Sequence, residues 1–275
     1  FGSPHLPHEA AKEDFALYDG QKDNLRHYYG EITGIDRAMG KLRKELRALG
    51  IHENTLVWYC SDNGGVKGFS ATGGRGNKGQ IYEGGLRVPA VIEWPARITK
   101  PVRTDVPAGT VDIYPTLLEI VGTRPPTQRP LDGLSLVPLI DERMAARPKA
   151  LGFWQYPAPG TRTPSKQVMS DLLAAQAKGD EVGDRTMLFA DAAKIKRQYP
   201  TDSYEGHAAW LDWPWKLHRI ESKDGTVNIE LYNLTADSQE SKDESARQPD
   251  RVKSMRADLD RWLASVTASL NGKDY

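Results

Sequence analysis

The sequence predicts an α/β fold followed by a smaller C-terminal α+β part. Residues 24–49 carry apolar side chains at alternating spacings of three and four, which is typical of a long amphipathic helix. The apolar run 56–60, rich in aromatic and β-branched residues, follows it and predicts a buried strand. In the last third, residues 222–225 indicate a hairpin turn, and a helical period returns from about residue 249.

The remaining elements follow in chain order. Residues 90–94 predict a second strand, and residues 112–122 predict a short helix with Asp112 at its N-cap and Gly122 at its end. A charged stretch with a proline, 141–149, marks a change of composition. We therefore predict an α/β domain over residues 1–145 and an α+β subdomain over 146–275, with a polar insertion or lid around 157–205.

Composition excludes several classes of partner. The 275 residues include 37 Lys+Arg and 37 Asp+Glu, so the net charge is zero and no global basic surface indicates nucleic acid. Cys60 is the single cysteine, which leaves no intrachain disulfide. No apolar run approaches the roughly 20 residues that span a bilayer. We expect neither nucleic acid nor a membrane as a partner.

The chemistry concentrates in two glycine-rich loops after the strand at 56–60. Asp62 and Asn63 supply hard oxygen ligands, which suit Ca²⁺, or less well Mg²⁺, rather than Zn²⁺. Lys78 is a point cation between glycines, where a ligand could approach backbone N–H groups. Alone, each feature is more commonly a tight turn or a solvated lysine. Together they indicate a site for a tetrahedral oxyanion, either sulfate or phosphate.

Two histidines are further candidates. His5 lies in a proline-bracketed segment and could act as an acid, a base or an oxyanion donor, or be a plain surface histidine. His207, in the smaller subdomain, is our candidate for a contact that selects the substrate, and otherwise it is a strand-end histidine.

These residues carry a resemblance to a family. Ser61-Asp62-Asn63-Gly64, Lys78-Gly79 and the Glu-Gly-Gly-Leu-Arg-Val-Pro segment at 83–89 resemble the second half of the formylglycine-dependent sulfatases. The resemblance implies part of an alkaline-phosphatase-like mixed sheet flanked by helices. It also implies that Asp62 and Asn63 bind calcium, and that Lys78 and His5 bind the sulfate and take part in catalysis. His8 has no counterpart in that pattern, and we expect it to be solvated.

The family's nucleophile is absent from this sequence. Sulfatases carry it in a Cys- or Ser-X-Pro-Ser-Arg segment, whose first residue is oxidised to formylglycine. Cys60 is followed by Ser-Asp-Asn instead and is predicted to be a small buried side chain. By resemblance, the formylglycine and the paired aspartates of the metal site should lie on an N-terminal segment or partner chain. The resemblance also implies a periplasmic, secreted or lysosomal location, with the targeting segment on that missing part.

The resemblance therefore implies hydrolysis of a sulfate ester, on a sulfated carbohydrate, by a calcium-dependent sulfatase. Two alternatives remain open at this stage. Phosphoester or phosphonate hydrolysis on the same scaffold would use similar motifs, because sulfate and phosphate have similar shapes. A non-catalytic fragment that binds sulfated glycans would need the same cations but no nucleophile.

Overall fold

The computed structural model describes residues 3–5, 7–69, 73–155, 165–180 and 198–274. Within it the chain forms two compact units. Unit 1 contains Phe1–Gly122, Gly133–Pro148 and Ser238–Glu240, and unit 2 contains Thr123–Asp132, Lys149–Asp237 and Ser241–Tyr275. The predicted assignment of 1–145 to a catalytic domain and 146–275 to a subdomain stays a prediction.

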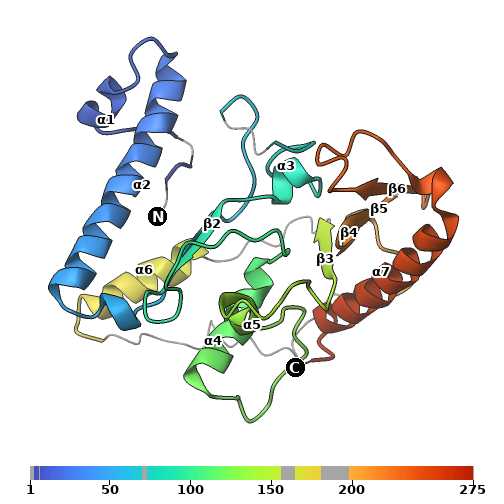
Figure 1. Cartoon of the computed structure of the whole chain (residues 1–275). Helices are drawn as coiled ribbons and strands as arrows, with labels where there is room; N and C mark the ends of the chain where they lie inside the picture. The colour runs from blue at the N-terminus through green and yellow to red at the C-terminus, as the bar shows by residue number, and fades with distance from the viewer. Residues whose placement is uncertain (1–2, 6, 70–72, 156–164, 181–197, 275) are drawn as a thin grey trace. The chain divides into compact units, whose positions relative to one another are not determined.

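Unit 1 begins with two helices that pack on each other, α1 (Lys12–Ala16) and α2 (Asp23–Ala48) (Figure 1). The long helix predicted at 24–49 is confirmed. Gly50 follows it with a φ of 68°, the left-handed conformation that commonly ends a helix. A short 3₁₀ turn, η1 (His52–Asn54), then leads into the first strand.

Strands β1 (Val57–Cys60) and β2 (Ala90–Glu93) form an antiparallel pair, at the positions the sequence predicts. Cys60 stands opposite Ala90, so the chain leaves β1 and enters β2 at the same end of the strand pair. The connection between them, residues 61–89, therefore projects from one place. It contains both glycine-rich loops and the short helix α3 (Glu83–Leu86).

Two more helices of unit 1 follow, α4 (Ile113–Val121) and α5 (Val137–Ile140), the first preceded by the 3₁₀ turn η2 (Thr110–Asp112). Gly122 ends α4 with a φ of 66°, as predicted. Asp112 is the N-cap residue of α4, as predicted, but its side chain makes no capping bond to this helix. The Asp112 carboxylate instead accepts the Leu134 N–H (2.8 Å) and binds the buried guanidinium of Arg147 at 2.8 and 2.9 Å.

Unit 2 is built on a four-stranded antiparallel sheet in the order β3-β4-β5-β6. The strands are β3 (Leu151–Gln155), β4 (Gly206–Asp212), β5 (Trp215–Glu221) and β6 (Val227–Asn233). The hairpin predicted at 222–225 joins β5 to β6, with Gly225 at a φ of 81°. Helix α6 (Ser165–Gln176) lies within the predicted insertion at 157–205, much of which lies outside the described residues.

The core of unit 2 lies between this sheet and the last helix, α7 (Pro249–Leu270), with the 3₁₀ turn η4 (Ser245–Arg247) before it (Figure 1). Met255, Leu259 and Leu263 of α7 pack against buried side chains of the sheet that include Leu217 and Leu231. Gly152 of β3 makes room for a tryptophan of α7, since a Cβ there would meet the indole ring at 2.5 Å. In the described parts of both units, no helix combines the length and the hydropathy needed to cross a bilayer.

Candidate functional site

The first loop of the predicted site is fixed at the end of β1. Ser61 N–H donates to the carbonyl of Pro89 (3.3 Å), and Gly64 N–H donates to the carbonyl of Gly85 (2.8 Å). Asp62 and Asn63 lie between these two anchors, with Asp62 exposed and Asn63 half-buried. Backbone bonds to residues 85 and 89, near the end of the same connection, therefore hold the Asp62–Asn63 turn on both sides.

The second loop lies against the first. Lys78 N–H donates to the carbonyl of Gly65 at 2.8 Å, directly after the Asp62–Asn63 turn. The backbone of Lys78 is fixed there. The residue is exposed, so its side chain can reach solvent or a ligand. The structure thus brings the two loops together through their backbones, as the two separate sequence motifs predict.

Three glycines of the connection lie so close to neighbouring backbone that no larger residue fits. A Cβ on Gly64 would lie 2.2 Å from the carbonyl oxygen of Gly84, and one on Gly84 would lie 2.2 Å from that of Gly76. A Cβ on Gly85 would lie 2.1 Å from the carbonyl oxygen of Gln80. Such contacts are far shorter than any real Cβ makes, so each position accepts only hydrogen as its side chain. The glycine-rich sequence therefore serves compact packing of the loops.

His5 and His8 differ in their surroundings. His5 belongs to unit 1 and is exposed. The expectation that His8 is solvated is wrong, because only 5% of its side chain is exposed and its Nδ1 lies 3.0 Å from Glu31 Oε2. Glu31 also accepts the Glu9 N–H at 2.7 Å, and the rings of Tyr28 and Phe69 pack on the imidazole. This contact anchors the segment after His5 to α2.

His207 lies in unit 2, on strand β4, while the other candidates lie in unit 1. Its Nε2 is 2.8 Å from Nδ1 of His218, which is fully buried on β5. The sequence analysis does not predict the contact between these two histidines. The strand register could have indicated it, because Ala209 stands opposite His218 and the side chains of 207 and 209 share a face.

The donors present suit part of a calcium site. Asp62 and Asn63 are oxygen ligands of the kind that Ca²⁺ prefers, but calcium takes six to eight oxygens. Among the residues that the structure describes, no group of three or more His, Cys, Asp and Glu side chains could hold a metal ion. Asp62 and Asn63 are two oxygen donors of the right chemical type, which is fewer than calcium takes.

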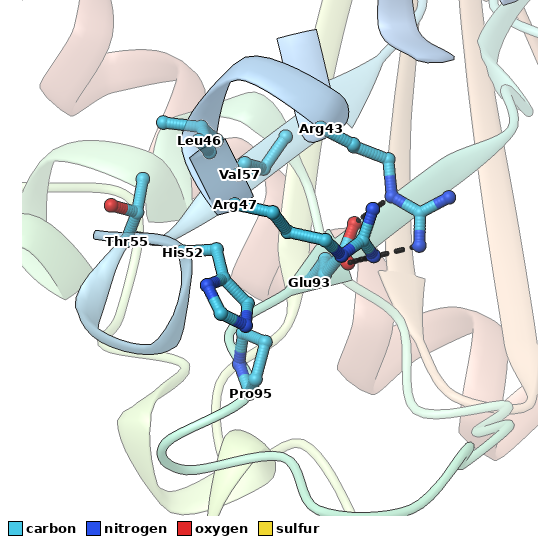
Figure 2. Close-up of a pocket in the computed structure, with 8 residues that line it drawn as sticks. All are labelled: Arg43, Leu46, Arg47, His52, Thr55, Val57, Glu93 and Pro95. Carbon is cyan, nitrogen blue, oxygen red and sulfur yellow. Dashed lines mark hydrogen bonds and ion pairs between the residues drawn. The ribbon is translucent and has the colours of Figure 1, made fainter. Parts of the chain in front are cut away.

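A small pocket of unit 1 lies apart from these loops, beside the end of α2 (Figure 2). Arg43 Nε lies 2.7 Å from Glu93 Oε2, and Arg47 Nη2 lies 3.7 Å from Glu93 Oε1, so Glu93 balances two cations. The pocket contains none of the predicted site residues. We assign it a role in packing α2 on β2.

Residues 1–123 match the model of the sulfatase family, which confirms the predicted resemblance. A stretch of 147 residues is 34% identical to a steryl-sulfatase of Rattus norvegicus, covering 50% of this chain and 24% of that protein. A stretch of 134 residues is 35% identical to an N-acetylgalactosamine-6-sulfatase of Mus musculus, covering 46% of this chain and 26% of that protein. The chain spans about a quarter of the length of these curated relatives.

The fold extends the similarity over both units. The crystal structure of Ps i-CgsB matches 98% of this chain and 53% of its own, with a TM-score of 0.71 and 21% sequence identity. At this identity the match concerns the fold alone. It agrees with the predicted fold class, a helix-flanked α/β part followed by an antiparallel sheet and a terminal helix.

Proposed function

From the match of residues 1–123 to the sulfatase family, we propose that this chain is part of an enzyme that hydrolyses sulfate esters on a sulfated carbohydrate. The observation that supports it most directly is the Lys78 N–H···O=C Gly65 bond, which fixes the backbone of Lys78 directly after the Asp62–Asn63 turn. One relative is named for a steroid sulfate and another for a sulfated sugar. The choice of a carbohydrate as substrate therefore goes beyond what the family match supports and is part of the proposal.

Each candidate residue has a proposed role. Asp62 and Asn63 hold Ca²⁺, which when bound neutralises charge on the sulfate oxygens. The Lys78 ammonium binds a sulfate oxygen and stabilises the negative charge that develops in the transition state. His5 binds sulfate or protonates the leaving alkoxide, and His207 contacts the alcohol part of the substrate.

The remaining parts of the site are proposed to lie on an N-terminal segment or partner chain of the same enzyme. That part would supply the formylglycine and the paired aspartates of the metal site. We propose that this enzyme acts in a periplasm, a lysosome or outside the cell.

The proposal is tested on the complete enzyme with matched aryl sulfate and aryl phosphate substrates. We expect sulfate hydrolysis that a calcium chelator abolishes and that Lys78→Ala lowers about 10²- to 10³-fold. Lys44→Ala, which changes an exposed lysine of α2, serves as the control and should leave turnover unchanged. Preferential hydrolysis of the aryl phosphate would overturn the assignment to sulfate esters. Binding of a sulfated glycan without turnover would overturn the proposal that the protein is an enzyme.

The calcium ligands have a separate test. Asp62→Asn keeps the shape of the side chain but removes its charge, so calcium affinity should fall while the thermal unfolding of the metal-free enzyme stays the same. Titration calorimetry with Ca²⁺ measures the affinity. Equal calcium affinity in the Asp62→Asn variant and the wild type would remove Asp62 from the metal site.

A further inference from the structure

A three-residue segment far along the chain belongs to unit 1. Residues Ser238–Glu240 are part of unit 1, whereas the chain on both sides of them belongs to unit 2. Glu240 is fully buried and has a φ of 50°, a left-handed conformation that is uncommon for a residue other than glycine. A buried carboxylate on an unfavourable backbone persists only where its surroundings hold it.

The contacts of Glu240 converge on the loop that carries Lys78. Its Oε2 accepts the backbone N–H of Glu83 at 2.6 Å, and its carbonyl accepts a bond from Arg75 Nη1 at 3.4 Å. The carbonyl of Arg75 in turn accepts the N–H of Gly84 at 2.7 Å. Glu240 therefore contacts both ends of the 75–83 segment, in the middle of which Lys78 lies.

Hydrogen bonds of Asp237 close a turn around the segment that contains Glu240. The Asp237 carboxylate accepts the N–H groups of Ser241 and Lys242, both at 2.8 Å, and the Ser241 hydroxyl at 3.0 Å. These bonds tie together the two ends of the segment 238–240 and so restrain the backbone of Glu240.

We propose that Glu240 is a positioning residue for Lys78. Its carboxylate accepts the Glu83 N–H, and its backbone carbonyl accepts the bond from Arg75. The carboxylate thereby closes the loop, so that Lys78 N–H meets the carbonyl of Gly65 and the ammonium is held at the oxyanion. Hydrogen bonds to a charged acceptor are about twice as strong as neutral ones, which suits a single side chain that holds a glycine-rich loop. This inference rests on the proposed function of Lys78.

The test compares three variants of the complete enzyme. Glu240→Ala removes the acceptor, Glu240→Gln keeps an acceptor oxygen without the charge, and Glu244→Ala is the control, because this nearby glutamate forms ion pairs with partly exposed lysine and arginine side chains. We expect Glu240→Ala to lower kcat about 10²-fold with little change in KM, as for a misplaced catalytic group. Glu240→Gln should recover part of the loss, and Glu244→Ala should match the wild type.

A second measurement distinguishes positioning from a general effect on the fold. If Glu240 acts through Lys78, Glu240→Ala should cost almost nothing further in a Lys78→Ala background. An equal loss of kcat in both backgrounds would overturn the proposal.

Hydrogen exchange tests the loop itself without any substrate. The amides of Glu83 and Lys78 should exchange at least about tenfold faster in Glu240→Ala and in Glu240→Gln than in Glu244→Ala. Unchanged exchange at both amides would overturn the proposal. If the wild-type enzyme hydrolyses no sulfate ester, the proposed function fails, while this exchange measurement still decides whether Glu240 holds the loop. Where Glu240→Ala does not fold, Glu240→Gln carries the same comparisons.

Discussion

Gly84→Ala should disrupt the predicted site through the backbone alone. A Cβ at this position would meet the carbonyl oxygens of Gly76 at 2.2 Å, Arg75 at 2.7 Å and Gly74 at 2.8 Å. Real Cβ contacts are essentially never below 3.0 Å, so the Gly76 carbonyl would have to move by about 0.8 Å, from 2.2 to 3.0 Å. All three contacts are with backbone, which cannot rotate away as a long side chain can.

The free-energy cost has two parts. Overpacking of a close-packed site costs about 1–3 kcal/mol. Movement of the loop also weakens the Gly84 N–H···O=C Arg75 bond, worth about 0.5–1.5 kcal/mol net. We therefore expect Gly84→Ala to lower the free energy of unfolding by roughly 2–4 kcal/mol. Because the same loop carries Lys78, turnover of an aryl sulfate should fall as well.

Urea denaturation and steady-state kinetics of the complete enzyme measure these effects. Gly40→Ala is the matched control, because a Cβ at Gly40 meets no atom within 4 Å and the position lies inside α2. The control should gain about 0.5–1 kcal/mol from helix propensity and keep full activity. A Gly84→Ala variant as stable and as active as Gly40→Ala would refute the argument that loop packing sets up the site.

Two further predictions concern the rest of unit 1. Asp112→Asn leaves the Arg147 guanidinium, whose side chain is 2% exposed, without its counter-charge, so the free energy of unfolding should fall by about 3–5 kcal/mol in urea denaturation. The exposed control Asp105→Asn should leave it unchanged, and an equally stable Asp112→Asn would contradict the assignment of a buried ion pair. Hydrogen bonds from Arg97 and then from a second arginine lower the pKa of Asp141 from 3.8 to about 2. The contribution of Asp141 to stability is therefore present above about pH 4 and is lost as the pH falls toward 2. In the Asp141→Asn variant the free energy of unfolding should fall less steeply with pH over that range. Equal pH dependence of the free energy of unfolding in the variant and the wild type would contradict this assignment.

Local pattern was sufficient to predict the long elements. The apolar period of residues 24–49 predicts α2, and Gly50 and Gly122 end their helices where a left-handed residue is expected. The sequence also brings Asp62, Asn63 and Lys78 into one strand-loop-strand connection, since all three lie between the predicted strands. Antiparallel pairing of β1 with β2 then brings the two ends of that connection together.

Other features depend on long-range contacts that no local pattern encodes. Asp112 has the residue type of an N-cap, but a buried arginine 35 residues away competes for its carboxylate and takes it. His8 has the composition of a surface turn, but Glu31 and two aromatic rings enclose it. In both cases a charged partner that is distant in sequence outweighs the local preference.

The sequence by itself determined the elements, their order and the chemistry of the loop between β1 and β2, because periodicity, turn residues and side-chain type are local properties. Only the tertiary structure decided which backbone atoms pack against the glycines. It also decided that Glu240, 157 residues after Glu83, accepts the N–H of Glu83. The physical reason is that burial and hydrogen bonding join atoms by their distance in space, which a chain sets only when it folds.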